Sequence, residues 1–108
     1  MYIKTLLATL FLVHVVNASL NCYVCDSSEG DTNCRSGSGV RNVTCSPPPS
    51  NHVRVCLAFA ETVSGVTKYI RKCDGELISS ACDEMRNRGR DIGNCYSCYS
   101  DYCNGNPL

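Results

Sequence analysis

The residues that could do chemistry are the cysteines, of which this 108-residue chain has ten. All of them lie after residue 18, at positions 22, 25, 34, 45, 56, 73, 82, 95, 98 and 103. Thiols at this density either form disulfides or bind a metal. The stretch 95–104 holds three of them and closes with a short Cys98-to-Cys103 loop followed directly by Asn104. We interpret this stretch as the crosslinked centre against which the earlier segments are held.

Residues 1–18 have the composition of a secretory signal peptide. Lys4 precedes an apolar run at 6–16, and Val16-Asn17-Ala18 is a small-residue cleavage site. The run is too short to span a bilayer. Cleavage after Ala18 would leave one domain, residues 19–108, in an oxidising compartment where disulfides persist.

Zinc binding is the alternative use of the thiols. Cys22-x-x-Cys25 and Cys95-x-x-Cys98 both have the spacing of a zinc knuckle. In a cytosolic chain this spacing would favour a metal, but the signal peptide and the even number of cysteines favour disulfides. Ten cysteines allow hundreds of complete pairings, and spacing alone does not choose among them. We expect no metal and no cofactor.

Other groups that could act in catalysis are sparse. His52 is the single histidine after residue 18, and it lies beside the proline-rich connector 46–50, where a solvated side chain is the ordinary finding. The sequence contains no Gly-x-Ser-x-Gly motif, and no thiol is left if all ten cysteines pair. The net charge of zero does not suggest nucleic acid or an anionic membrane surface as a partner. We therefore expect a protein that is not an enzyme and binds no nucleic acid.

The segments that must position the cysteines alternate between strand-like and turn-like composition. Residues 20–25 and 40–45 are predicted to pair as a first hairpin with a long polar loop. The β-rich runs 53–60 and 66–73 predict a second hairpin, joined by a turn at 61–65.

The last third of the chain predicts a smaller, mixed unit. Residues 91–96 are predicted as the return strand of a third hairpin. Ser80 followed by Asp83 could form a capping box that opens a short helix through Arg88. No repeat and no long linker divides the chain, so we expect one domain that is all-β apart from this helix.

The cysteine pattern resembles that of the three-finger domain, the family of snake toxins, lymphocyte antigens and the urokinase receptor known as the LU domain. The resemblance rests on the opening Cys22-x-x-Cys25, a middle series, and the closing Cys98-x4-Cys103-Asn104, and it covers the whole chain after residue 18. Many members have adjacent cysteines where this chain has Cys95-x-x-Cys98. The compact, divergent fingers look more like invertebrate members, including those related to quiver proteins.

The resemblance implies a small disulfide-rich fold in which three β-hairpins leave a disulfide hub. It also implies that the amide of Asn104 turns into the hub and hydrogen-bonds backbone groups there. Carried over in order, the family's pairing gives Cys22–Cys56, Cys25–Cys34, Cys45–Cys73, Cys82–Cys95 and Cys98–Cys103.

In function, the resemblance implies a secreted binding module whose partners are membrane receptors or ion channels, of the nicotinic type for example, or other extracellular proteins. We expect the contact at the tip and flanks of the second finger, because its long arms should project the tip farthest from the hub. The residues of this expected surface are Arg54, Glu61, Thr62, Val63, Ser64, Gly65, Lys68 and Tyr69. Asn42-Val43-Thr44 is a sequon, so a glycan on Asn42 is a further expectation.

Two other roles stay open at this point. Many members of the family carry a lipid anchor, but an anchor signal needs ~10–20 apolar residues after the domain, and only residues 105–108 follow Asn104. We therefore expect a secreted monomer without an anchor or a transmembrane segment. A structural component of extracellular junctions or matrix is the other role, and the sequence does not choose between it and a receptor modulator.

Overall fold

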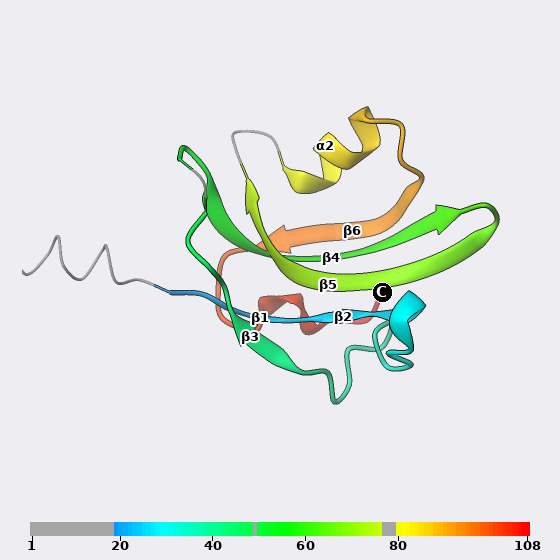
Figure 1. The fold of residues 1–108 in the computed structure, drawn as a ribbon, viewed down its shortest axis with the longest axis horizontal. Coiled ribbons are helices and arrows are strands. Elements are labelled where there is room, and N and C mark those ends of the chain that lie inside the picture. Colours follow the sequence, from blue (N-terminus) through cyan, green and yellow to red (C-terminus); the bar gives the residue numbers. More distant parts are fainter. Residues whose placement is uncertain (1–18, 49, 77–79) are drawn as a thin grey trace, which may run out of the picture.

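The computed structural model describes residues 19–48, 50–76 and 80–108, so the predicted signal peptide lies outside the described residues. The strands form two antiparallel sheets (Figure 1). The first pairs β1 with β3, and the second has the strand order β2-β5-β4-β6. The elements are β1 (Asn21–Tyr23), β2 (Cys25–Asp26), η1 (Ser27–Glu29), β3 (Asn42–Thr44), β4 (Val53–Val63), β5 (Val66–Glu76), α2 (Ala81–Asn87), β6 (Ile92–Cys98) and η2 (Cys103–Gly105).

Three fingers extend from a cluster of cysteines, as the resemblance implies. The first finger is residues 20–45, the second is 53–76, and the third is 80–98. Buried residues and partly buried cysteines packed against them form the cluster, which we call the hub. Its members are Leu20, Cys22, Cys45, Cys56, Cys73, Cys98 and Cys103.

Five disulfides crosslink the hub and the fingers, and they are the five pairs that the resemblance implies. They are Cys22–Cys56, Cys25–Cys34, Cys45–Cys73, Cys82–Cys95 and Cys98–Cys103. No cysteine in the described ranges is free. The sulfur atoms of both zinc-knuckle spacings are therefore in disulfides, which leaves no thiolate there for a metal.

The second finger is the predicted hairpin, with a shorter turn than expected. β4 and β5 pair without interruption from Val53 opposite Glu76 to Val63 opposite Val66. Only residues 64–65 form the turn, and both have positive φ, 52° and 80°. Positive φ at both central residues is what a two-residue type I′ turn requires, and this turn fits the twist of the strands. The predicted turn at 61–65 is therefore wrong in length, since its first three residues belong to β4.

β4 is the central strand of the molecule and is buried on both faces from Val55 to Glu61. Its apolar residues Leu57 and Phe59 face a core that includes α2, whereas Cys56 faces the hub. The alternation in the sequence predicted the strand correctly. It did not show that the second face is also covered.

The outgoing arm of the third finger is α2, and its return arm β6 pairs with β4 where the sequence predicted a third hairpin. The helix begins where the capping pattern predicts, because the side chain of Ser80 accepts a hydrogen bond from the Asp83 N–H at 3.2 Å. Its buried face packs Met85 and two neighbours against β4 and β6. The disulfide between Cys82 and Cys95 fastens the two arms.

Candidate functional site

The tip of the second finger projects past its neighbours on both sides (Figure 1). Pairing with β6 ends where Glu61 lies opposite Ile92, and pairing with β2 reaches only Ile70. At the tip, Val63 and Val66 are 52% and 68% exposed. They are directly opposite each other, so their side chains share one face of the hairpin. The result is an exposed apolar pair on the two sides of a two-residue turn.

The strand register divides the expected binding residues between two faces. Lys68 lies on the same face as the valine pair, because it is opposite Glu61 two positions along. Thr62 and Tyr69 point to the other face. Arg54 is nine positions from Val63 along β4, where its Nε donates to the Ser46 carbonyl at 3.4 Å. The structure therefore does not bring Arg54 to the tip.

Glu61 supports the tip from below instead of forming part of an exposed turn. It is only 6% exposed, and its two carboxylate oxygens accept from Nε and Nη2 of Arg90 at 2.7 and 2.8 Å. Nζ of Lys68 lies 3.8 Å from the same carboxylate. The guanidinium of Arg90 also lies over the ring of Phe59, at 5.7 Å. No local sequence pattern marks Arg90 as a partner of Glu61, because the two residues are 29 positions apart.

We predict that the Glu61–Arg90 ion pair stabilises the fold at neutral pH and that this stabilisation is lost in acid. The hydrogen bond from Arg90 lowers the pKa of the Glu61 carboxyl below its ordinary value of 4.5. A carboxyl whose pKa is lower in the folded state contributes stability above its unfolded pKa, and this contribution is lost as the pH falls through the folded pKa. The thermal midpoint of wild type should therefore exceed that of Glu61→Gln at neutral pH, and the two should converge in acid. A difference that is constant over this range would contradict the prediction.

The first finger packs against one flank of the second. The Cζ atom of Arg35 lies 5.2 Å above the ring of Tyr69, in a cation–π arrangement. The Tyr69 N–H donates to Oγ of Ser27 at 2.8 Å. Tyr69 is thus partly buried by the first finger and is less available to a partner than the valine pair.

Asn104 lies fully buried between the two sheets. Its Oδ1 accepts from the Tyr23 N–H at 2.9 Å. Its Nδ2 donates to the carbonyls of Tyr23 and Leu57 at 2.9 and 3.0 Å. The amide therefore joins β1 to β4 through three hydrogen bonds, which is the geometry that the resemblance implies.

Arg71 is a second buried support, and the residues next to it in the sequence do not mark it as one. Its side chain is fully buried, although it carries a charge. Its Nε and Nη2 donate to two carbonyls of the first finger, those of Cys34 and Arg35, at 2.8 and 2.9 Å. Its Nη1 donates to the carbonyls of Asn104 and Asn106. One guanidinium thus holds the first finger and the C-terminal segment against the sheet.

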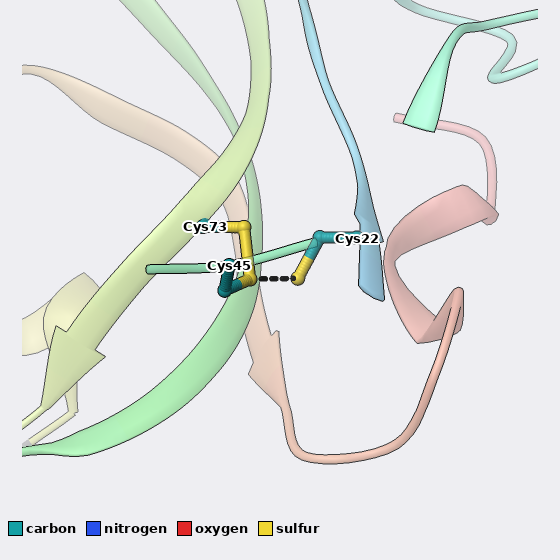
Figure 2. A group of neighbouring side chains, drawn as sticks. All are labelled: Cys22, Cys45 and Cys73. Carbon is teal, nitrogen blue, oxygen red and sulfur yellow. Dashed lines mark hydrogen bonds between the residues drawn. A yellow bond between two sulfur atoms is a disulfide. The ribbon is translucent and has the colours of Figure 1, made fainter. Parts of the chain in front are cut away.

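Figure 2 shows three of the hub sulfurs, those of Cys22, Cys45 and Cys73. They lie within 4.8 Å of one another, a separation that would suit metal ligands if they were thiolates. All three are in disulfides, because Cys22 is bonded to Cys56 and Cys45 is bonded to Cys73. The cluster therefore consists of two disulfides in contact.

A comparison with protein families shows which family the chain belongs to. The family described as the Quiver family u-PAR/Ly-6-like domain matches residues 20–104. The chain is a member of the Quiver family. Domains of the Ly-6 and u-PAR type are small extracellular or cell-surface modules that bind other proteins and are not enzymes. Comparisons with curated proteins and with solved structures found no match.

Within the ranges that the structure describes, this Quiver-family chain has no helix long and apolar enough to cross a membrane. The sequon residue Asn42 is exposed on β3. Glycosylation of Asn42 stays a prediction.

We predict that the mature form of this Quiver-family protein begins near Ser19 and contains no free thiol. Its mass under non-reducing conditions should be about 10 Da below that of the fully reduced chain, since each of the ten thiols loses one hydrogen. Mass spectrometry of the intact protein measures this difference. Labelling by a thiol reagent without reductant, or a retained zinc ion, would contradict it.

Proposed function

We propose that this protein is a secreted, monomeric binding module that contacts a membrane receptor or ion channel, such as one of the nicotinic type, through the tip of its second finger. The observation that carries the proposal is the exposed pair Val63 and Val66 at the end of the longest hairpin. An apolar pair that reaches no core of its own chain is a suitable anchor for a pocket on a partner.

The support below the tip favours the same function. Binding costs free energy when it orders loops and side chains, and a rigid finger avoids most of this cost. Here the turn has two residues, and the Glu61–Arg90 ion pair holds the strand beneath it. The hub disulfides fix the base of the finger.

We predict that Val63→Asp with Val66→Asp weakens binding to the partner at least tenfold, or about 1.4 kcal/mol. The two carboxylates would replace the apolar anchor and would have to be desolvated on binding. Affinity is measured with oxidised, folded protein on cells that display the partner. Val53→Asp is the matched control, since Val53 is 55% exposed on the same strand but lies at its opposite end. Unchanged affinity in the tip variant, or an equal loss in the control, would contradict a site at the tip.

The partner is identified by photo-crosslinking from the tip. A photoreactive amino acid at Ser64, which is exposed within the turn, would react with whatever the tip contacts on living cells. The same probe at Ser100, an exposed residue after β6, controls for capture unrelated to the tip. A receptor or channel captured only from position 64 supports the proposal. A matrix or junction component captured there would favour the structural role.

A further inference from the structure

The two disulfides in contact at the hub join the two sheets to each other. Cys22 on β1 is bonded to Cys56 on β4, and Cys45, directly after β3, is bonded to Cys73 on β5. Across these bridges, Sγ of Cys22 lies 3.2 Å from Sγ of Cys45 without a bond between them (Figure 2). The native pairing therefore couples the first finger covalently to the second.

The same four residues are also close neighbours in a second combination, Cys56 with Cys73 and Cys22 with Cys45. Cys56 and Cys73 are directly opposite in the β4–β5 register, and directly opposed residues point to the same face of a sheet. The sulfurs of Cys22 and Cys45 are already in contact. In this second pairing each disulfide stays within one sheet and its neighbouring segment, so neither joins the two sheets.

We propose that the hub is a disulfide-exchange switch that converts the inter-sheet pairing to the intra-sheet pairing Cys22–Cys45 and Cys56–Cys73. The switch needs a catalytic thiolate, supplied by a small thiol such as glutathione or by a thiol–disulfide isomerase. It needs no oxidant, because two disulfides are present before and after.

Exposure indicates where the exchange begins. Cys22 and Cys56 are fully buried and Cys45 is 6% exposed, whereas Cys73 is only partly buried. The thiolate attacks Sγ of Cys73, forms a mixed disulfide and releases the thiolate of Cys45. That thiolate attacks the adjacent Sγ of Cys22 and releases the thiolate of Cys56.

The last step returns the catalyst. The Cys56 thiolate attacks Sγ of Cys73, which lies opposite it, and expels the external thiolate. Three sulfur–sulfur bonds form and three break. The mass of the protein is unchanged.

The exchange releases the first finger from its disulfide links to the second finger. After exchange, the β4–β5 ladder is intact, but the first finger is held to it only by contacts such as the Asn104 bonds to Tyr23 and the pairing of β2 with β5. Because the structure has the native pairing, the exchanged form should be a minor state of the free protein, in the range of roughly 0.1–10%.

The wild-type protein tests the proposal directly. Folded, oxidised protein is incubated with reduced and oxidised glutathione, quenched in acid, alkylated and mapped by non-reducing mass spectrometry. We expect peptides linked through Cys22–Cys45 and Cys56–Cys73 at unchanged intact mass, with the Cys25–Cys34 and Cys82–Cys95 bridges retained. Absence of the new pairs, or their appearance only together with scrambling of all ten cysteines, would overturn the proposal.

A pair of double variants isolates the exchanged form. Cys22→Ser with Cys45→Ser leaves only Cys56 and Cys73 at these positions, and we expect them to form a disulfide in the folded protein. Cys45→Ser with Cys73→Ser leaves the native Cys22–Cys56 bridge and is the matched control. Amide exchange in residues 20–45 should be at least ~tenfold faster in the first variant than in the control. Two free thiols in a folded first variant, or equal exchange rates, would overturn the proposal, whichever partner the finger binds.

Discussion

Replacement of Arg71 by leucine is expected to lower the free energy of unfolding by about 3 kcal/mol, because two buried and two part-buried carbonyl groups lose a donor at once. An unsatisfied buried polar group costs about 1–3 kcal/mol. The net loss is smaller than the sum, since leucine also removes the cost of burying a charge. A loss of this size is a large part of the stability of a small domain. Secretion of the variant should fall steeply.

Two further variants separate the hydrogen bonds from the charge and the size of the side chain. Arg71→Lys keeps the charge but has three donors on one nitrogen, and it cannot reach the first finger and the C-terminal segment with the fork geometry of arginine. We expect its thermal midpoint to lie between wild type and Arg71→Leu. Arg88→Leu is the matched control, because Arg88 is exposed and its pair with Glu84 on α2 contributes only about 0.3–0.5 kcal/mol.

Secreted yield and thermal midpoint, measured with all disulfides intact, check this prediction. If Arg71→Leu unfolds at the temperature of wild type, the buried guanidinium is not a support of the fold. If Arg71→Lys behaves as wild type, the charge alone accounts for the effect and the fork geometry does not matter.

The burial of Arg71 is a feature that local sequence signals do not predict. Local signals predicted the second hairpin from its β-rich arms and the start of α2 from Ser80 and Asp83, because each signal lies within a few residues of its effect. An arginine in a strand normally lies at the surface, and nothing adjacent to Arg71 marks it as buried. Its burial depends on segments more than thirty residues away in either direction.

A weak signal for this burial is present in β4. Ala58 lies opposite Arg71 on one side and opposite Tyr96 of β6 on the other. A small residue at that point leaves space above the sheet, which the guanidinium and the tyrosine ring can fill. The disulfide pairing, by contrast, came from the resemblance alone, since spacing allows hundreds of pairings.

The sequence predicted where the fingertip lies but not all of the residues that form and support it. The composition of the two strands predicted the position of the tip, and Val63 is exposed there as expected. Val66 is exposed beside it because the turn has only two residues, which places Val66 at the start of β5. Glu61 was expected at the surface, yet Arg90 binds it from a segment 29 residues away. Which strand passes beside Glu61 depends on the β4–β6 register, which has an irregularity between Phe59 and Glu61. No local pattern predicts such a register.

Replacement of Asn104 by alanine is expected to lower the free energy of unfolding by about 1–3 kcal/mol, because it leaves the Tyr23 N–H and the carbonyls of Tyr23 and Leu57 without their partner. These three groups are where β1 meets β4, so the first finger should loosen before the rest. Thermal midpoint and amide exchange measure the two effects. Asn106→Ala is the matched control, since the Asn106 side chain is exposed in the same segment and should change stability by less than about 0.5 kcal/mol.

Asn104→Asp distinguishes the donor from the acceptor role of the same amide. Aspartate keeps an oxygen for the Tyr23 N–H, but its ionised carboxylate has no donor for the carbonyls of Tyr23 and Leu57 and places a negative charge beside them. We therefore expect it to be at least as unstable as Asn104→Ala at neutral pH. On protonation the acid gains one donor, so its deficit relative to wild type should shrink as the pH falls, while that of Asn104→Ala should not. If the loss of stability in Asn104→Asp does not change with pH, the two carbonyls do not need the amide donor.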